Sequence, residues 1–553
     1  MSFDVTSLHG RRAAGRWERL SVGDILERLT YSFPEREALV GWEGAYAYPE
    51  HRRLTYRQAD TLTNRIAGAL LARGLRRSDR VLMVCENSNE AMLVKLACAK
   101  AGLVAMPINP SLAADVVAAL IERCEPALGI VDAELLGAAE RAGARVDVTI
   151  PIGEPSGAAD GACSFAEFIA GASEQEPDVE IHGDDIWEIL FTSGTTALPK
   201  AVMLSHVYTY IAGHAHAISL GRGVQVEGDV VITDFLPMIY HVGGHILPPA
   251  AWFCGGTFVM GRRYDPQAEA AAITAERITG IFAGQSVMVQ ALADALEGDP
   301  DRFDGHSLQV LMYGWSQVSP ELVERLKRLC GEQLSLVEIF GQTESITNHR
   351  FWVEQWPEVH RERAPADNYV GVPCPMLASV VVDPATPGAT PVAPGVPGEA
   401  VYRSPAMTAG YYRDEQATRE AFRDGWFHSG DSCVVDEGGR RIMVDRYKDI
   451  VKTGGENVSS LRVESIVQQH PEVAKAAVVG LPHERWGEAV TAFAVPAGGT
   501  RPEEASMLAF CRERLAGYEV PKRIVLVDAL PETVGGKVLK YRLREEHTAL
   551  YRG

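Results

Sequence analysis

Residues 190–202 read LFTSGTTALPKAV: an apolar, strand-like run enters a loop of hydroxyl side chains around one glycine, and a lysine follows. Hydroxyls and turn N–H groups can surround phosphate oxygens, and Lys200 adds a mobile positive charge. The segment is not a Walker loop, because no Gly-Lys-Ser/Thr follows at the required spacing. Clusters of Ser, Thr and Gly are also frequent in ordinary turns, so the residues alone leave both a turn and a phosphate site open.

Strand-like and helix-like patterns alternate on both sides of this loop. Residues 80–84 and 103–107 have strand character, whereas residues 58–73 and 90–101 have helical character. The same rhythm returns later, with strands expected at Ile186–Thr192, Val230–Phe235, Gly280–Ala283 and Val310–Tyr313. Alternation of this kind predicts βαβ units around a parallel sheet, and therefore an α/β fold.

The chain is expected to divide at a hinge near residues 446–449. Residues 1–445 would form a large N-terminal domain, with a β-rich subdomain at 366–445 where glycine, proline and short β-branched runs are frequent. Residues 446–553 show helical patterns at 461–469 and 503–515 and extended ones at 474–479 and 489–495. About a hundred residues of this kind can fold as a small α+β domain.

Composition narrows the class of protein. The 553 residues are 46% hydrophobic and carry a net charge of −20, which argues against a nucleic-acid partner, whose footprint would be basic. Nine cysteines without a C-x-x-C pair indicate a reducing compartment rather than a zinc site. The longest stretch without formal charge, 245–261, falls short of the ~20 residues of a membrane span and is interpreted as a buried strand and turn. We expect a cytoplasmic monomer or homodimer without a membrane span.

Six further segments follow the loop in order along the chain. They are 237–244 (PMIYHVGG), 340–344 (FGQTE), 424–431 (DGWFHSGD), 445–449 (DRYKD), 453–458 (TGGENV) and 535–537 (GGK). Together with the loop, this set resembles the signatures of the adenylate-forming superfamily, which includes acyl-CoA synthetases, luciferases and peptide-synthetase adenylation domains. The resemblance extends from about residue 20 to residue 545 and points to the acyl-CoA ligase branch.

The resemblance implies a ligase that joins a carboxylic acid to coenzyme A through an acyl-adenylate, using ATP and Mg²⁺. Glu344 would hold Mg²⁺, Asp431 would accept both ribose hydroxyls with help from Arg446, and Phe340 would stack on adenine. The implied nucleotide-binding residues are Thr192, Ser193, Gly194, Thr195, Thr196, Phe340, Gly341, Gln342, Thr343, Asp431 and Arg446. The implied catalytic residues are Lys537, Lys200, Thr343, Glu344 and His241. Lys537 is expected to stabilise the charge that builds up during adenylation.

The second half-reaction is expected to use another face of the small domain. In the family this domain rotates about the hinge position, here Asp449, between adenylation and thioester formation. Gly454, Gly455 and Glu456 would then line the coenzyme A tunnel, where glycine permits close backbone approach.

The acyl pocket is expected to use segments that line it in the family. Its implied residues are Tyr240, His241, Gly284, Gln285, Ser286, Tyr313, Gly314 and Trp315. Gln285 and Ser286 are polar where an apolar residue and proline are frequent, and Trp315 is bulky. Because buried polar groups need partners, a bulky and partly oxygenated acid is expected.

Several positions depart from the family pattern. Ala197 and Ala201 replace glycines of the loop, at a cost of about 1–2 kcal/mol if a left-handed backbone is required there. Asp445 replaces a glycine and brings an acid close to the expected nucleotide. The other departures are Ser460 and Arg462, where proline and glutamate are common, and Tyr240, which looks like an insertion before His241.

These departures leave four hypotheses open. The chain is a two-step ligase that tolerates them, or a ligase that performs only thioester formation on an acyl-adenylate received from an adenylating partner enzyme. Alternatively, it loads the thiol of a carrier protein, or it is a non-catalytic nucleotide-binding homologue. A serine hydrolase and a dinucleotide oxidoreductase are disfavoured, because G-x-S-x-G and an early G-x-G-x-x-G are missing.

Overall fold

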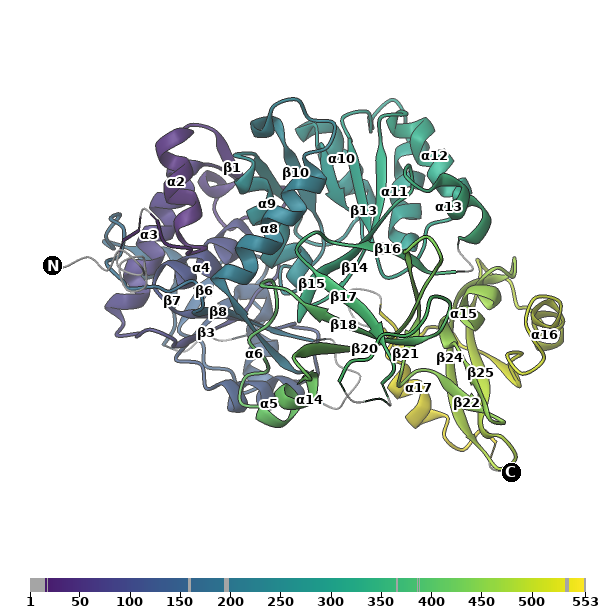
Figure 1. The fold of residues 1–553 in the computed structure, drawn as a ribbon. Coiled ribbons are helices and arrows are strands. Elements are labelled where there is room, and N and C mark those ends of the chain that lie inside the picture. Colours follow the sequence, from purple (N-terminus) through teal and green to yellow (C-terminus); the bar gives the residue numbers. More distant parts are fainter. Residues whose placement is uncertain are drawn as a thin grey trace.

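The computed structural model describes residues 15–551, except residue 17, segments 158–160, 193–197, 365–366 and 533–536, positions 385 and 387, and the side chains of 346–348. Two large sheets with helices on their faces make up most of the chain, and a smaller sheet follows in the C-terminal part (Figure 1). The expected α/β class with parallel strands is therefore confirmed.

The largest sheet combines a parallel core with an antiparallel extension. Its strands, in spatial order, are β17 (Ala378–Val382), β18 (Gly398–Arg403), β20 (Trp426–Val435), β21 (Arg441–Arg446), β16 (Tyr369–Pro373), β15 (Ser345–Trp352), β14 (Ser335–Gln342), β13 (Val310–Tyr313), β12 (Gly280–Phe282), β10 (Val231–Asp234), β11 (Thr257–Met260), β1 (Glu37–Gly41) and β2 (Arg53–Thr55), and β19 (Phe422–Arg423) pairs with β20. The strands from β14 to β1 are parallel. The β-rich segment 366–445 supplies the antiparallel extension, which joins this sheet because β15 pairs with β16.

Helices α10 (Pro266–Glu276), α11 (Ser286–Gly298) and α12 (Pro320–Cys330) pack against the parallel core. Each presents an apolar face, on which Ile273, Leu292 and Leu326 are fully buried. Such side chains at helical spacing explain why these segments form helices against the sheet. Helices α13 (Pro357–Arg363) and α14 (Glu415–Ala421) lie in the connections of the extension.

The second sheet has the strand order β7 (Cys163–Ser164), β6 (Val148–Ile150), β5 (Leu128–Asp132), β3 (Arg80–Val84), β4 (Val104–Pro107), β8 (Ile186–Phe191) and β9 (Ala201–Ser205). Only the β8–β9 pair is antiparallel. Its helices are α3 (Tyr56–Ala72), α4 (Asn89–Lys100), α5 (Ala114–Cys124), α6 (Leu136–Arg141) and α7 (Phe165–Ile169). Every residue of α4 is buried, including Lys95, so charged groups on this helix must find partners inside the protein.

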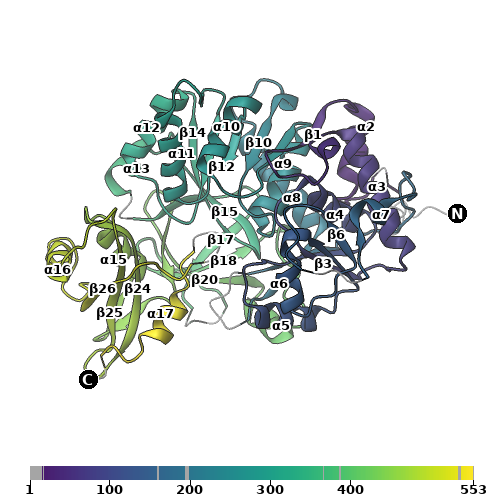
Figure 2. The same ribbon diagram turned by 180° about the vertical axis from the view of Figure 1, so that it is seen from behind.

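The C-terminal sheet contains β23 (Glu456–Val458), β22 (Val451–Thr453), β25 (Gly487–Pro496), β24 (Val473–His483) and β26 (Arg523–Leu526). Helices α15 (Ser460–Gln468), α16 (Glu504–Arg512) and α17 (Lys540–Glu546) accompany it. In both views α17 lies between this sheet and β20 (Figures 1 and 2). Strand β21 ends at Arg446 and β22 begins at Val451, so the expected hinge lies between two sheets.

The stretch 245–261 differs from its expectation. Residues 241–246 form a π-helix (η4, His241–Ile246) that runs into α9 (Leu247–Phe253), and only the last part forms β11. The two prolines of α9 stand in its first turn, where no N–H donor is needed, so they do not prevent a helix.

Helices α2 (Asp24–Ser32) and α8 (His206–Leu220) complete the N-terminal part. Among the described residues, no helix is long and apolar enough to cross a membrane.

Candidate active site

Hydrogen bonds close the base of the loop at 190–202. The N–H of Thr192 donates to the carbonyl oxygen of Lys200 at 3.0 Å, and the N–H of Lys200 donates to Oγ1 of Thr192 at 3.2 Å. Both ends of the loop are therefore fixed by strands β8 and β9. The other predicted phosphate contacts, Ser193, Gly194, Thr195 and Thr196, lie outside the described residues, as does the departure at Ala197.

Ala201 lies in the extended backbone of β9. It pairs with Phe191, and its carbonyl oxygen accepts the N–H of Tyr412 at 2.8 Å. A strand backbone suits any L-residue, so a left-handed conformation is not required at this position. The strain considered for alanine in this loop does not arise at Ala201.

Lys200 and Glu344 approach each other through a tyrosine. Nζ of Lys200 lies 4.3 Å from the ring centre of Tyr411, and the Tyr411 hydroxyl donates to Oε1 of Glu344 at 2.9 Å. The hydroxyl of Tyr208 donates to the carbonyl oxygen of Thr343 at 3.0 Å, which fixes the preceding residue. Tyr411 escaped the sequence analysis because its contact with Glu344 spans 67 residues and no local motif marks it.

Asp431, on β20, lies at the centre of the site. Its register partner on β21 is Arg446, whose Nε is 2.6 Å from Oδ1 of Asp431. The carboxylate is fully buried, yet neither of its oxygens accepts a hydrogen bond from a described residue. Burial raises the pKa of Asp431, against the opposing charges of Arg446 and Lys537. Because buried acceptors normally find donors, this carboxylate fits a ligand that carries two hydroxyl groups.

Lys537 reaches this centre from near the end of the chain. The N–H of Leu539 donates to the carbonyl oxygen of Pro531 at 2.7 Å, which closes the base of the loop that carries Lys537. The side chain retains solvent access, but crowding by protein atoms and the charges of Arg446 and Lys448 lower the pKa of Lys537 to about 8. Asp431 acts on Lys537 in the opposite direction, so the two groups share one electrostatic environment.

The segment 340–344 begins in the last three residues of β14 and continues into the turn that follows. Phe340 is half-buried with its ring centre 6.2 Å from that of His349, and Gly341 is exposed. Nε2 of Gln342 is buried and has no hydrogen-bond partner among the described residues. Gln342 therefore offers a donor to a ligand at this end of the sheet.

The loops after β12 and β13 meet at the predicted acyl pocket. The N–H of Gly314 donates to the carbonyl oxygen of Gly284 at 3.0 Å, and Oγ of Ser316 donates to Oγ of Ser286 at 2.8 Å. Ser286 thus has a protein partner, which removes one reason to expect an oxygenated substrate. Gln285 makes no side-chain hydrogen bond to a described residue and can still engage one.

Tyr313 and Trp315 lie in different environments. Tyr313 is fully buried in the core beneath the sheet, whereas Trp315 is 51% exposed. The Trp315 ring meets Phe282 edge-on at 5.6 Å between centres. Its backbone has φ of 65°, which is uncommon for a bulky residue and marks local strain.

The π-helix carries His241 at its first residue. Tyr240 immediately precedes this π-helix, whose turn is wider than that of an α-helix. Burial and the nearby imidazoles of His245 and His216 lower the pKa of His241 to about 3, so its ring is neutral near pH 7. A Cβ on Gly244 would lie 1.9 Å from the Met238 carbonyl oxygen, which explains glycine there.

A buried ion pair supports this π-helix. Nζ of Lys95 lies 2.5 Å from Oε1 of Glu188 and donates to the carbonyl oxygen of Gly244 at 2.7 Å. Nδ1 of His245 bonds Oε2 of Glu188, and its Nε2 bonds Oγ1 of Thr209 at 2.8 Å. Burial alone would raise the pKa of Glu188, but Lys95 and His245 outweigh it and lower that pKa. The carboxylate therefore connects α4, β8 and the π-helix.

The hairpin between β22 and β23 carries Gly454, Gly455 and Glu456. The two glycines have φ of 59° and 90°, and all three residues are exposed. The hairpin forms the β23 end of its sheet, whereas Figure 1 shows α17 close to β20 and β21. The structure therefore brings Lys537 to Asp431 and leaves this hairpin open to solvent.

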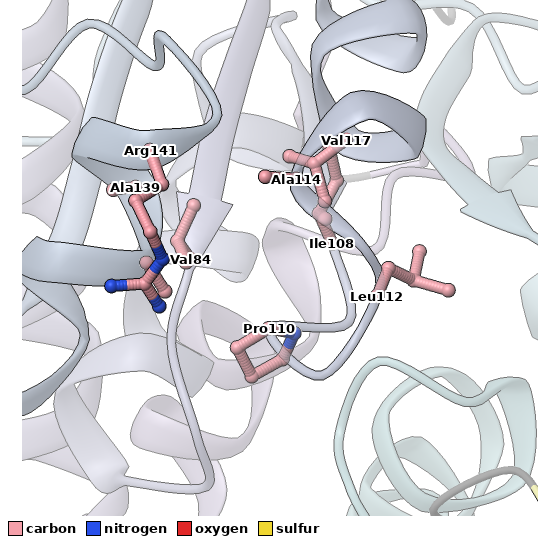
Figure 3. Close-up of a pocket in the computed structure, with 9 residues that line it drawn as sticks. Val84, Ile108, Pro110, Leu112, Ala114, Val117, Ala139 and Arg141 are labelled. Carbon is pink, nitrogen blue, oxygen red and sulfur yellow. The ribbon is translucent and has the colours of Figure 1, made fainter.

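A separate cavity of about 50 Å³ lies between α5 and α6 (Figure 3). Its volume suits one or two water molecules but not a nucleotide. It uses none of the predicted site residues, and its lining residues are Val84, Ile108, Pro110, Leu112, Ala114, Val117, Ala138, Ala139 and Arg141.

Residues 26–412 match the family model described as AMP-binding enzyme, and residues 462–537 match the one described as AMP-binding enzyme C-terminal domain. A feruloyl-CoA synthase from an Amycolatopsis species is 31% identical, covering 93% of this chain and 98% of that protein. The fatty acid–[acyl-carrier-protein] ligase ScoC from Streptomyces coeruleorubidus is 32% identical, covering 90% and 92%. The crystal structure of ATP-bound MatB from Rhodopseudomonas palustris is similar at 27% identity and a TM-score of 0.79, covering 96% and 99%.

The buried pair beneath the π-helix makes a stability prediction. Glu188→Gln leaves the Lys95 cation buried without its carboxylate, so we expect a loss of about 3–5 kcal/mol in the free energy of unfolding. Urea denaturation followed by circular dichroism measures it. The matched control is Glu415→Gln, which breaks the exposed Arg419–Glu415 pair on α14 and should leave the urea midpoint unchanged. An unchanged midpoint in Glu188→Gln would contradict the expectation.

Proposed function

Because the chain belongs to the AMP-binding enzyme family, we propose that it joins a carboxylic acid to coenzyme A through an acyl-adenylate. In the first half-reaction, a carboxylate oxygen of the acid attacks the α-phosphorus of ATP and pyrophosphate leaves. In the second, the thiolate sulfur of coenzyme A attacks the acyl carbon and AMP leaves. The thiol proton passes to solvent.

One observation carries this proposal: Lys537 shares an electrostatic environment with Asp431 and Arg446, although it lies about a hundred residues further along the chain. A cation at this point would stabilise the negative charge that develops between the acid and the α-phosphate. Lys200 and Glu344, linked by Tyr411, supply the charges expected on the pyrophosphate side.

The nucleotide would be held mainly by groups that accept or donate no hydrogen bond within the described residues. The two oxygens of Asp431 match the two hydroxyls of a ribose, and the charge of Arg446 favours the ionised carboxylate. The Nε2 donor of Gln342 would reach an acceptor on the adenylate. Phe340, half-buried at the strand end, would stack on the adenine ring.

Mg²⁺ fits the site as an ion bound largely by the nucleotide. Among the residues described by the structure, no three His, Cys, Asp or Glu side chains gather as a metal site. Magnesium commonly takes one or two carboxylates together with phosphates and waters, and Glu344 is the carboxylate in position. When bound, the ion would neutralise phosphate charge while Lys200 and Tyr411 hold Glu344 in place.

The second half-reaction would need a different arrangement of the C-terminal sheet. Rotation about Asp449 would withdraw Lys537 and bring the exposed hairpin at 454–456 to the acyl-adenylate. The left-handed glycines of that hairpin leave room for a narrow thiol ligand. His241, neutral near pH 7, would act as a gate rather than as a charged catalyst.

The acid would lie against Trp315 and Phe282, with Gln285 as the available polar group. An acid with a flat, apolar body and a single polar substituent matches these contacts better than a long straight chain. This narrows the expectation of a bulky, oxygenated acid, since Ser286 already bonds Ser316.

The first experiment tests the two half-reactions separately. The protein is given ATP, Mg²⁺ and a panel of carboxylic acids, and ATP–pyrophosphate exchange is measured before coenzyme A or a phosphopantetheinyl carrier protein is added as acceptor. Mass spectrometry of the products identifies the acid and the preferred thiol. We expect exchange and acyl-CoA formation, because Ala201 lies in an extended strand and the charged groups Lys200, Glu344, Asp431 and Lys537 are all present.

Other outcomes of this experiment support the alternative hypotheses. Acyl-CoA formation only from supplied acyl-AMP would support the thioester-only ligase that depends on an adenylating partner enzyme. Loading of the carrier alone would support the carrier ligase, and no turnover with any acid or thiol would support a non-catalytic homologue.

The lowered pKa of Lys537 predicts a pH dependence. The ammonium form is the active one, so ATP–pyrophosphate exchange should be fast below the pKa of about 8 and fall as the pH rises through it. Coenzyme A is absent from this assay, so its thiol does not contribute. In Lys537→Arg the charge does not titrate in this range and the alkaline fall should disappear. Exchange in the wild type that stays constant to high pH would contradict the assignment.

We expect substitution of Trp315 to change the selectivity among acids and the stability of the protein in ways that can be measured separately. Trp315→Gly and Trp315→Ala both remove the ring, so both should raise kcat/KM for bulkier acids relative to smaller ones. Only glycine relieves the left-handed backbone, so the glycine variant should be more stable than the alanine variant by about 1 kcal/mol. Competition assays and urea midpoints measure the two effects. Unchanged selectivity in both variants would remove Trp315 from the acyl pocket.

A further inference from the structure

Two departures from the family pattern, Asp445 and Ser460, contact each other directly. Oδ2 of Asp445 accepts the N–H and the hydroxyl of Ser460, both at 2.6 Å. Oδ1 accepts the N–H of Arg446 at 2.7 Å. Asp445 belongs to the largest sheet and Ser460 begins α15, so this contact spans the hinge segment between two sheets.

Lys540 completes this cluster. Its Nζ donates to Oγ of Ser460 at 2.6 Å and lies 2.8 Å from Oε1 of Glu464. The Ser460 hydroxyl therefore accepts from Lys540 and donates to Asp445. Burial alone would lower the pKa of Lys540, but the carboxylates of Glu464, Asp445 and Asp449 outweigh it and raise that pKa.

Helix α17 makes a second contact with the hinge. Nη2 of Arg544 lies 2.7 Å from Oδ1 of Asp449. Helix α17 thus reaches Asp449 directly through Arg544 and reaches Asp445 through the Ser460 hydroxyl that bonds Lys540. Lys540 follows Lys537 by three residues, which keeps their Cα atoms within about 10 Å of each other.

We propose that Lys540 is a positioning residue that holds Lys537 beside Asp431 and Arg446 for adenylation. The inference rests on the proposed function and adds that the two half-reactions depend on different contacts. Asp445 precedes the hinge residue Asp449 and Ser460 follows it, so rotation there separates them. The contact between Asp445 and Ser460 therefore belongs to the adenylation arrangement alone, whereas Lys540, Ser460 and Glu464 all follow the hinge and keep their mutual contacts.

The test compares the half-reactions in Lys540→Met. Withdrawal of Lys537 should lower ATP–pyrophosphate exchange by about 10²-fold, the usual effect of a small misplacement in a catalytic group. Thioester formation from supplied acyl-AMP should stay near the wild-type rate. Lys540→Arg should recover part of the exchange. Arg523→Met, which breaks the Arg523–Glu504 pair elsewhere in the same sheet, should leave both half-reactions unchanged.

A second variant guards against simple misfolding. Lys540→Met alone leaves Glu464 buried without its cation, so Lys540→Met/Glu464→Met removes both charges and should fold. It should lose exchange to the same extent as the single variant. Equal losses in both half-reactions, or undiminished exchange, would overturn the proposal.

Amide hydrogen exchange gives a readout that needs no activity. The N–H groups of Arg446 and Ser460 are bonded to Asp445, so peptides that contain them should exchange faster in both Lys540 variants. Unchanged protection there would also overturn the proposal. A wild type without either half-reaction would refute the proposed function. Faster amide exchange in the variants would still show that Lys540 supports the contact between Asp445 and Ser460.

Discussion

The buried carboxylate of Asp431, set against Arg446 on the neighbouring strand, is the constraint on which the rest of the site depends. Taking a carboxylate out of water costs several kcal/mol unless opposing charge and donors compensate it. Arg446 supplies charge at 2.6 Å from Oδ1, and neither carboxylate oxygen accepts a hydrogen bond from a described residue. The register of β20 and β21 sets this pair, and the same strand end leads into the hinge.

That geometry ties nucleotide binding to the position of the C-terminal sheet. Arg446 is the last residue of β21, and Asp445 beside it bonds the first residue of α15. The ion pair at the proposed ribose site and the contact between Asp445 and Ser460 thus involve adjacent residues of β21. A movement at the hinge cannot leave the charge balance around Asp431 unchanged, because Lys537 contributes to it.

Local sequence patterns predicted the strands of the sheets well. They did not predict contacts between residues that are distant in the sequence. Strand β13 agrees with its expected range, because its apolar run is buried and bounded by turns. The stretch 245–261 was expected as a buried strand and turn, but its first part forms helix α9 and only Thr257–Met260 forms a strand, because prolines in the first turn do not stop a helix. Asp445 and Ser460 were each recognised as unusual, but their contact needs the chain to fold back across the hinge. No local pattern marks it.

When residues that depart from the family pattern are judged one at a time, their energetic cost can be overestimated. An alanine in place of a glycine is costly only where the backbone is left-handed, and at 201 it is extended. Ser286 looked like a polar group in need of a ligand until Ser316 supplied its partner. In both cases the environment of the residue, not its type, decides the energetic effect.

The contacts around the hinge also set the free energy that the reaction must supply to separate them. Hydrogen bonds to charged groups contribute about 1.5–3 kcal/mol each, so separating Asp445 from Ser460 and Asp449 from Arg544 costs several kcal/mol. A ligand shifts such an equilibrium only by its differential affinity for the two arrangements. In the proposed reaction, departure of pyrophosphate would remove negative charge balanced by Lys537 and Lys200, which would weaken the arrangement that holds Lys537. Binding of the thiol by the glycine hairpin would then favour the other arrangement, so the order of the two half-reactions follows from the charge that leaves after the first.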